Sequence, residues 1–263
     1  MTIEFVTDTV KLYVTGRVAT VELNRPESLN SLNVEMLKGL AAVLKEISQS
    51  SEVDIVVLRG NGRAFSSGGD IKTMLLEANE EDFPMVMDCI SEVVSTLYTM
   101  PKLTISAITG AAAGLGLSIA LATDYIVADK ASKLAMNFIG IGLIPDGGGH
   151  YFLEKRLGED KAKHLIWEGK LLSAEEALQN GLIHEIAQGT LDEALEAKLQ
   201  RLLNSPIQAM IETKIILAEK NSPQLLKVLE LEREGQRKMR LTKDHQEGIQ
   251  AFLEKRRPVF TGK

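Results

Sequence analysis

The sequence predicts an α/β fold built on parallel strands, and three observations support this prediction. Short apolar runs typical of buried strands alternate with segments of helical periodicity. Two of those runs lead directly into glycine-rich stretches that open a helix-like segment, at residues 64–72 and 110–122. From about Leu191 the strand signals disappear, and charged helical segments run to the end of the chain. We therefore expect stacked units of strand, glycine turn and helix.

The first elements predicted are a β-hairpin, a helix and a strand. Residues 10–14 and 18–23 alternate in polarity on either side of Gly16, which suits a hairpin turn. Apolar residues recur with helical spacing from 33 to 47. The run at 55–58 then predicts a strand that leads into the first glycine loop.

The middle of the chain repeats the same order of elements. A Met/Leu-rich helix is expected after the first glycine loop, followed by a charged surface loop at 77–82. A helix from about 84 to 99 stops before Pro101. Strands are predicted at 104–108 and 125–128, on either side of the second glycine loop and its helix, and a further helix begins near His150.

The last part of the chain is predicted to be helical, with interruptions at Pro206 and Pro223. We accordingly divide the chain into an α/β core at 1–195 and a helical C-terminal subdomain at 196–263. Its apolar faces either pack on a neighbouring molecule or cover the core of the same chain, and the sequence leaves both possibilities open.

The bulk composition excludes several classes of function. Hydrophobic residues make up 44% of the chain and charged residues 25%, as in an ordinary globular protein. The net charge of −6 argues against nucleic acid as a partner. The single cysteine, Cys89, allows no disulfide framework and no thiolate metal site. The longest apolar run, at 115–122, is too short to span a bilayer, and the N-terminus does not resemble a secretion signal. We therefore expect a cytoplasmic protein with no membrane partner.

The two glycine loops are candidate sites for an anionic oxygen. Gly68 and Gly69 let the backbone approach a ligand closely, and Leu115 begins the helix after the second loop, where its N–H is unpaired. Two converging N–H donors are what a developing oxyanion requires. The simpler alternative is a pair of tight turns, with Asp70 as an ordinary helix cap.

Ser118 lies in Gly116-Leu117-Ser118-Ile119-Ala120, which has the spacing of a nucleophile turn. A serine hydrolase also needs a histidine base and an acid to orient it. None of the four histidines of the chain has the sequence context of a triad. We therefore expect Ser118 to line a pocket or to pack inside a helix.

Asp146 follows Pro145 and precedes Gly147, so it suits a turn or a helix cap. The segment 138–144 before it is apolar, however, and desolvation in an apolar pocket would raise the pKa of a carboxyl group toward the range of a general base. The residues alone leave both interpretations open.

Six segments of the chain together resemble the crotonase family, the enoyl-CoA hydratase/isomerase superfamily. The matching segments, in chain order, are residues 24–32 (NRPESLNSL), 64–72 (AFSSGGDIK), 110–124, 139–149, 172–183 and 247–256. The resemblance implies a ClpP-like spiral of β-β-α units with a helical C-terminal trimerisation region. It also implies homotrimers or hexamers formed by two trimers, with acyl-CoA thioesters as ligands.

The resemblance assigns roles to individual positions. The N–H groups of Gly69 and Leu115 would hold the thioester carbonyl, next to Gly68. Further positions would bind coenzyme A: Ala64 and Ser66 near the adenine, Asp70, Ile71 and Lys72 along the loop, and Phe252 and Lys255 reaching coenzyme A on a neighbouring subunit.

The departures from the family pattern indicate the reaction. The two glutamates that activate water in the hydratases would fall at Ser118 and Phe138, and neither of these residues can accept a proton. These two side chains would instead shape a drier pocket. Asp146 falls where dienoyl-CoA isomerases and the phenylacetate-pathway isomerase that forms oxepin-CoA carry a catalytic aspartate.

The resemblance thus favours an acyl-CoA isomerase with Asp146 as its base and with no metal or other cofactor, because coenzyme A is part of the substrate. A hydratase that uses a loop carboxylate is one alternative; the candidates are Glu77, Glu80, Glu81 and Asp82. A non-catalytic acyl-CoA-binding subunit is the other.

Overall fold

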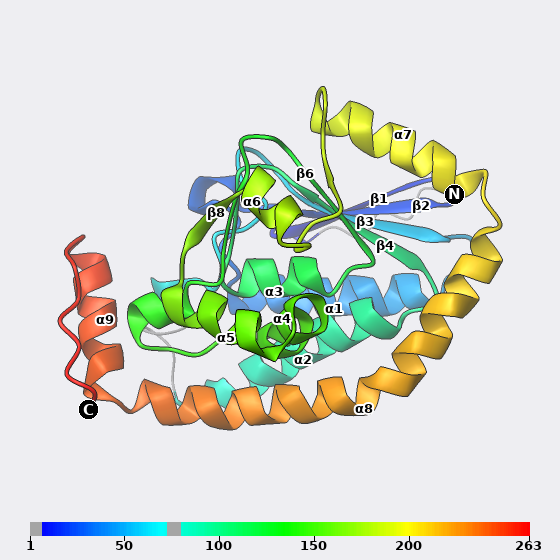
Figure 1. Cartoon of the computed structure of the whole chain (residues 1–263). Coiled ribbons are helices and arrows are strands. Elements are labelled where there is room, and N and C mark those ends of the chain that lie inside the picture. Colours follow the sequence, from blue (N-terminus) through cyan, green and yellow to red (C-terminus); the bar gives the residue numbers. More distant parts are fainter. Residues whose placement is uncertain (1–6, 73–79) are drawn as a thin grey trace.

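The core of the protein is a six-stranded sheet in the computed structural model, which describes residues 7–72 and 80–263 (Figure 1). Its strands, in spatial order, are β1 (Val10–Thr15), β2 (Val18–Leu23), β3 (Ile55–Gly60), β4 (Leu103–Ile108), β6 (Tyr125–Ala128) and β9 (Glu185–Ile186). Only β1 and β2 pair antiparallel, as the predicted hairpin requires, and the other neighbours are parallel. Gly16 makes the hairpin turn with φ of +57°. The predicted parallel α/β sheet is confirmed.

A second, three-stranded sheet was not predicted. It contains β5 (Ala111–Ala113), β7 (Lys133–Ala135) and β8 (Leu171–Ser173), in the order β5-β7-β8. Each strand has only three residues, and β5 consists of alanines, so neither β-branched residues nor alternation marks them in the sequence. In chain order β5 follows β4 and β7 follows β6, so the chain passes alternately through the two sheets. This alternation produces the spiral of strands and helices.

The helices follow the predicted order. They are α1 (Val34–Gln49), α2 (Phe83–Thr99), α3 (Leu115–Leu121), α4 (Gly149–Leu157), α5 (Glu159–Glu168), α6 (Ala174–Gln179), α7 (Leu191–Leu203), α8 (Ile207–Arg240) and α9 (Lys243–Leu253). Short 3₁₀ turns lie at Pro26–Ser28, Glu80–Asp82 and Phe138–Ile141 (η4). Asn33 caps α1 by accepting a hydrogen bond from the Met36 N–H at 2.9 Å. The helix expected directly after the first glycine loop lies mostly outside the described residues.

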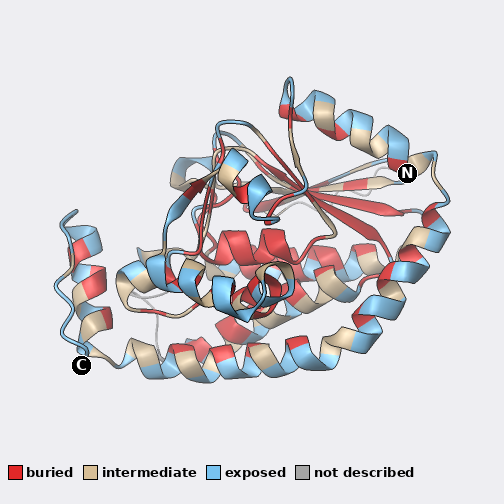
Figure 2. Ribbon diagram, viewed as in Figure 1, coloured by how far each residue is buried: buried red, intermediate tan, exposed pale blue. Residues whose placement is uncertain are grey.

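Both faces of the main sheet are buried (Figure 2). Val56 and Leu58 of β3 belong to the cluster that contains α1, α2 and α3, whereas Ile55 and Val57 face a second cluster formed with α7 and the start of α8. Figure 1 shows α7 on the side of the sheet opposite α1 and α2. Parallel strands covered on both faces explain why the strand segments are continuously apolar.

The predicted interruption at Pro223 is wrong, because α8 runs through this residue. Pro223 has no N–H to donate to the carbonyl of Glu219, and the Ser222 hydroxyl lies 3.4 Å from that oxygen instead. Buried Leu225 and Leu229 pack the following turns onto the core and stabilise the helix despite the proline. Helix α8 curves around the body in Figure 1, as expected of a helix that contains a proline.

The C-terminal helices cover the core of the same chain, which was one of the two possibilities that the sequence left open. Helix α8 contacts α2 and α4, and α9 packs on η4. Gly248 is required there, because a Cβ at this position would lie 2.6 Å from the Ile141 Cα atom. The predicted division between residues 195 and 196 falls inside α7 and stays a prediction. None of the helices among the described residues is long and apolar enough to cross a membrane.

Candidate active site

The two glycine loops are joined side by side through backbone hydrogen bonds. The Ser66 N–H donates to the Ala111 carbonyl and the Ala113 N–H donates to the Ser66 carbonyl, both at 3.0 Å. Ser66 and Ala112 therefore form a parallel bridge. Gly69 and Leu115 each lie three residues beyond this bridge. The two segments that carry the positions predicted to hold an anionic oxygen therefore start side by side and run in the same direction.

The close contact of these loops requires glycine at position 68. Its φ is +103°, and a Cβ there would lie 2.9 Å from the Ala113 carbonyl oxygen. Within the described ranges, neither the Gly69 N–H nor the Leu115 N–H has a hydrogen-bond acceptor. Both residues line a cavity of about 650 Å³. The two unpaired donors beside one cavity can donate hydrogen bonds to an anionic oxygen.

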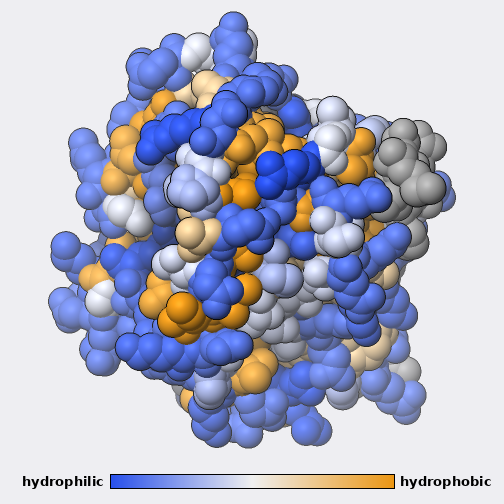
Figure 3. All heavy atoms as spheres, turned by 90° about the vertical axis from the view of Figure 1, so that its right-hand side faces the viewer, coloured by the Kyte–Doolittle hydropathy of each residue, from blue (hydrophilic) through white to orange (hydrophobic). Residues whose placement is uncertain are grey.

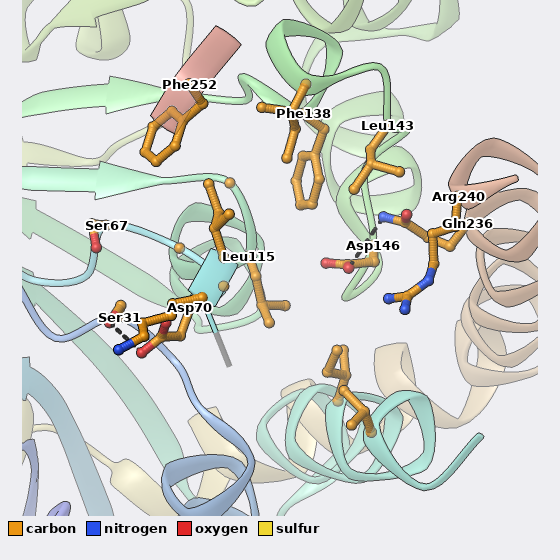
Figure 4. Close-up of a pocket in the computed structure, with 18 of the residues that line it drawn as sticks. Ser31, Ser67, Asp70, Leu115, Phe138, Leu143, Asp146, Gln236, Arg240 and Phe252 are labelled. Atoms are coloured by element: carbon orange, nitrogen blue, oxygen red, sulfur yellow. Dashed lines mark hydrogen bonds between the residues drawn. The ribbon is translucent and has the colours of Figure 1, made fainter. Parts of the chain in front are cut away.

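The cavity is largely apolar, and parts of the chain other than the two glycine loops supply most of its walls (Figure 4). Helix α2 contributes one wall, and η4 with the segment after it contributes a second. Helix α8 supplies polar Gln236 and Arg240, and α9 supplies Phe252 and Leu253. The apolar residues of the first two walls are Phe83, Val86, Met87, Ile90, Phe138, Ile141 and Leu143. An apolar ligand fits this lining better than a polar one does.

The carboxyl group of Asp146 points into this cavity (Figure 4). The residue is only 8% exposed. Its Oδ2 atom accepts a hydrogen bond of 3.2 Å from Gln236, whereas Oδ1 has no partner among the described residues. Burial, and next the negative charge of Glu232, hold the pKa of Asp146 well above its usual value. A buried carboxyl group with a raised pKa and one unoccupied oxygen is suited to proton transfer.

Asp146 does not cap the helix that follows it, which the sequence had left as a possibility. The cap residue of α4 is Gly148, which has no side chain to accept a hydrogen bond from the first turn. Glu232 of α8 supplies it instead, accepting from the Gly148 N–H at 2.7 Å, the His150 N–H at 3.1 Å and His150 Nδ1 at 2.8 Å. Because a distant glutamate satisfies these donors, the Asp146 carboxylate remains available to the cavity.

The turn after Asp146 packs directly on the second glycine loop. Gly147 has φ of +61°, and a Cβ there would lie 2.7 Å from Leu115 Cδ1 and 3.1 Å from Ser118 Cβ. The residue that follows the candidate base thus contacts the residue that carries one of the two N–H donors. A carboxylate and two N–H groups at adjacent places can act on one carbonyl compound.

The first loop is fixed from the N-terminal segment by an ion pair that sequence reasoning missed. Arg25 Nη1 lies 2.8 Å from Asp70 Oδ2, and the Ser31 hydroxyl donates to the same oxygen at 3.1 Å. Both partners belong to the segment 24–32, so that motif supplies the support for the loop. Asp70 also lines the cavity, next to Gly69.

The structure brings most of the predicted site residues together. Those that line the cavity are Gly68, Gly69, Asp70, Ile71, Lys72, Leu115, Phe138, Asp146 and Phe252. Ala64, Ser66, Ser118 and Lys255 do not line it. Phe252 reaches the cavity of its own chain, whereas the resemblance placed it on the ligand of a neighbouring subunit. The predicted ligand contacts of these residues stay predictions.

The four residues outside the cavity lining have other surroundings. The carbonyl of Ala64 accepts from Asn30 Nδ2 at 2.8 Å, and the Ser66 hydroxyl donates to the Asn30 carbonyl at 2.8 Å. Lys255 follows the last turn of α9 with φ of +54°. Ser118 is fully buried, and its hydroxyl lies 3.5 Å from the Gly114 carbonyl and 3.8 Å from Met136 Sδ. These contacts give Ser118 a packing role and no histidine partner in the described part of the chain.

Ser118 and Phe138, where the family resemblance expects the glutamates of a hydratase, supply no carboxylate to activate water. Phe138 is buried at the cavity wall, and a Cβ added at Gly114 would lie 3.7 Å from its ring. Ser118 packs against the turn that carries Asp146. Of the alternative loop carboxylates, Asp82 lines the cavity, and Glu77 falls outside the described residues.

Sequence reasoning also missed Glu232 and Gln236. The buried face of α8 carries Leu225, Leu229, Glu232 and Gln236, at intervals of four, three and four residues. Two polar side chains therefore occupy positions where the helical period requires apolar ones. That exception was the available signal, although it does not reveal which groups the two side chains contact.

Comparison with known proteins agrees with the geometry. The family model described as enoyl-CoA hydratase/isomerase matches residues 14–263. The chain is 54% identical to YhaR of Bacillus subtilis, which is named after that family, over 93% of this chain and 96% of the relative. It is 36% identical to the 1,2-epoxyphenylacetyl-CoA isomerase of Escherichia coli, over 95% and 97%. An enoyl-CoA hydratase structure from Mycobacterium avium subsp. paratuberculosis superposes with a TM-score of 0.87 at 30% identity, covering 96% of this chain and 98% of the other.

Proposed function

The chain belongs to the enoyl-CoA hydratase/isomerase family, and from this premise we propose that it moves a carbon–carbon double bond within an unsaturated acyl-CoA. Relatives carry the names of both hydratases and isomerases, so the choice between the two reactions depends on the residues of this chain. The observation that supports isomerisation is the buried carboxyl group of Asp146, which lines an apolar cavity and whose Oδ1 has no hydrogen-bond partner among the described residues.

The proposed reaction converts a 3-enoyl thioester into the conjugated 2-enoyl thioester. The thioester oxygen accepts hydrogen bonds from the Gly69 and Leu115 N–H groups. Asp146 removes a proton from C2, and the electron pair of that C–H bond delocalises over the thioester oxygen and C4. The protonated Asp146 then donates the same proton to C4, and the double bond forms between C2 and C3. The proton count is unchanged, so the reaction consumes neither water nor a redox or metal cofactor.

The apolar walls support this assignment over water addition. Phe138 stands where a hydratase would carry a glutamate that positions water, and Leu143 and Ile90 also line the cavity. A dry cavity strengthens the hydrogen bonds to the thioester oxygen and keeps water from the dienolate. The raised pKa of Asp146 makes it a stronger base than an exposed carboxylate, which suits removal of a weakly acidic proton.

A second candidate is hydration of the 2-enoyl thioester with Asp82 as the acid or base. Asp82 is the loop carboxylate that both lines the cavity and remains exposed to solvent, so water can reach it. In this reaction Asp146 would have no direct role, and Asp82 would be required.

Product analysis distinguishes the two reactions. Purified protein is supplied separately with a 3-enoyl-CoA and a 2-enoyl-CoA, and the products are resolved by chromatography. Isomerisation without 3-hydroxyacyl-CoA, unchanged in Asp82→Asn, supports the proposal. Rapid water addition that Asp82→Asn abolishes would establish hydration instead. Binding of both thioesters without turnover would indicate a non-catalytic subunit.

We propose further that coenzyme A lies along the first loop, with Lys72 near its phosphates and Phe252 and Lys255 contributing from the tail. A homotrimer, or a hexamer of two trimers, is the proposed assembly, and the cytoplasm is the proposed location. Helix α8 keeps Ile216, Leu217 and Leu226 more than half exposed, and apolar patches interrupt the polar surface on the side of α7 and α8 (Figure 3). These apolar faces support contact with other copies of the chain, which sedimentation velocity measures.

A further inference from the structure

Two buried polar residues of α8, Glu232 and Gln236, contact Asp146 or the turn that carries it. Glu232 is 2% exposed and Gln236 is 3% exposed, and they lie four residues apart on the helix face that meets the 144–150 turn. Gln236 Nε2 donates to the Ile144 carbonyl at 2.6 Å and to Asp146 Oδ2 at 3.2 Å. Glu232 accepts from the two backbone N–H groups on the far side of Asp146, those of Gly148 and His150.

The orientation of the Gln236 amide follows from its partners. The Ile144 carbonyl can only accept, so the nitrogen of the amide must be the atom that faces it. The same NH₂ group carries a second hydrogen, and Asp146 Oδ2 lies within its reach. One amide therefore joins the backbone before Asp146 to its carboxyl group. The other oxygen, Oδ1, is buried, has no hydrogen-bond partner among the described residues, and lies on the side of the carboxyl group away from Gln236 (Figure 4).

We propose that Gln236 and Glu232 are positioning residues for Asp146: Gln236 fixes which carboxyl oxygen faces the substrate, and Glu232 holds the turn that carries it. This inference rests on Asp146 being the base of the proposed reaction. It extends the active site to α8, ninety residues further along the chain. Neither residue touches the reacting atoms in this scheme, so both act through Asp146.

The two residues have opposite effects on the pKa of Asp146. Because mere packing would give no such opposite effects, they distinguish a positioning role from packing. The hydrogen bond from Gln236 favours the ionised carboxylate, whereas the negative charge of Glu232 disfavours it. Other charged or titratable groups also surround Asp146, in the cavity or behind the turn. They are Arg240 of α8, His150 of α4, Asp82 before α2, and Asp70 and Lys72 of the first loop. None of these groups is substituted in the variants compared below. His150 pairs with Glu232, so Gln236→Met, which leaves that pair intact, is the variant free of any change at His150.

The test is the titration of the Asp146 carboxyl group by ¹³C NMR of the full-length protein, with its resonance identified by its absence from Asp146→Asn. Gln236→Met keeps the size of the side chain and removes the donor, and should move the titration of Asp146 to higher pH. Glu232→Gln removes the charge, and should move it to lower pH. Gln236→Glu, which also lacks the amide donor and adds charge, provides a second upward shift if the methionine variant folds poorly.

Matched controls on the same helix are Gln224→Met and Glu234→Gln, both at exposed positions. They should leave the titration unchanged. In the isomerase assay, Gln236→Met should lower kcat about 10- to 100-fold, as loss of an orienting partner does elsewhere, with little change in KM. Shifts of the same sign in both variants, or none, would overturn the inference.

The titration needs no turnover, so it remains informative whatever the reaction is. If Asp146→Asn isomerises 3-enoyl-CoA as fast as the wild type, the proposed function fails, whereas opposite titration shifts would still establish the two contacts. If Asp146→Asn is inactive and Gln236→Met retains full kcat and an unshifted titration, only the positioning role fails.

Discussion

Asp146 combines two properties that are rarely found together in a carboxylate that has no catalytic task. It is nearly inaccessible to solvent, and one of its oxygens has no hydrogen-bond partner among the described residues. Burying an incompletely paired carboxylate costs free energy, because the charged form loses its hydration. The raised pKa of the group is the direct expression of that cost. A residue that destabilises the fold in this way is a candidate for function.

The first prediction is that Asp146→Asn stabilises the protein in a pH-dependent way. The pKa of Asp146 is higher in the folded than in the unfolded state, so between the two values the folded state binds more protons. Stability therefore falls as pH rises through that window and stays low above it. Asparagine cannot ionise, so the variant should have a higher melting temperature at pH 8 and no advantage below pH ~4.

Calorimetry across this pH range measures the effect, and each kcal/mol corresponds to roughly 2–4 °C for a chain of this size. Glu234→Gln on the exposed side of α8 is the control for loss of one charge. A variant that is equally stable, or less stable, at pH 8 would contradict the strained environment assigned to Asp146.

At this scale the sequence was informative where the chemistry is local. Asp146 could be selected because its apolar neighbours at 138–144 adjoin it in the chain. Gln236 could not be selected as its partner, since a contact across ninety residues has no local signature. The pairing of Arg25 with Asp70, across 45 residues, was missed for the same reason.

Among the elements, the two glycine loops matter most, because their relative position sets the distance between the Gly69 and Leu115 N–H groups. The bridge between Ser66 and Ala112 holds the loops together, and Gly68 permits their close approach. The small second sheet, through β5, provides one side of this bridge region. Its three-residue alanine strand gives no sequence signal, although the function of the loops depends on it.

The second prediction concerns Gly68→Ala. The new Cβ would meet the Ala113 carbonyl at 2.9 Å and would also be strained at φ of +103°, so the loops must separate. A displacement of about 1 Å between catalytic groups lowers rates by about 100-fold, and we expect a loss of that order in kcat/KM for isomerisation.

Gly181→Ala is the matched control, since its φ is +74° and a Cβ there meets nothing within 4 Å. It shares the backbone strain but lies away from the site, so its kcat/KM should stay near the wild-type value. Equal rates for Gly68→Ala and the wild type in steady-state assays would show that the spacing of the loops is not critical.

Element boundaries were predicted well where periodicity or caps are strong, as in β6 and α1. They failed at Pro223, where local propensity predicts a break and packing of Leu225 and Leu229 overrides it. Tertiary contacts of this kind are not encoded in a short window of sequence.

For the molecule as a whole, α8 connects the candidate site to the opposite end of the core. Near its start, Lys214 is buried, and its Nζ atom donates to the carbonyls of Leu97 at 3.0 Å and Lys102 at 2.9 Å. It also forms an ion pair of 2.9 Å with Asp124. Burial lowers the pKa of Lys214, and the charge of Asp124 opposes that shift. This network fixes the helix whose later turns carry Glu232 and Gln236.

The third prediction is that Lys214→Met destabilises the protein by about 1–3 kcal/mol, the usual cost of leaving buried acceptors without their donor. The acceptors affected are the carbonyls of Leu97 and Lys102, whereas Asp124 keeps its hydrogen bonds from Thr104. Urea unfolding gives the difference in free energy from the midpoint, provided the slope is unchanged. Lys220→Met, an exposed position on the same helix, should change stability by less than about 0.5 kcal/mol. A loss below about 1 kcal/mol in Lys214→Met would mean that packing alone anchors α8.

The central claim is that Asp146 transfers the proton in a double-bond shift. The measurement that tests it most directly is the rate of conversion of a 3-enoyl-CoA into the conjugated 2-enoyl-CoA by the wild type and by Asp146→Asn. The account predicts measurable conversion by the wild type and a loss of at least about 100-fold in the folded variant, the lower range for removal of a general base. Conversion by Asp146→Asn at the wild-type rate would contradict it.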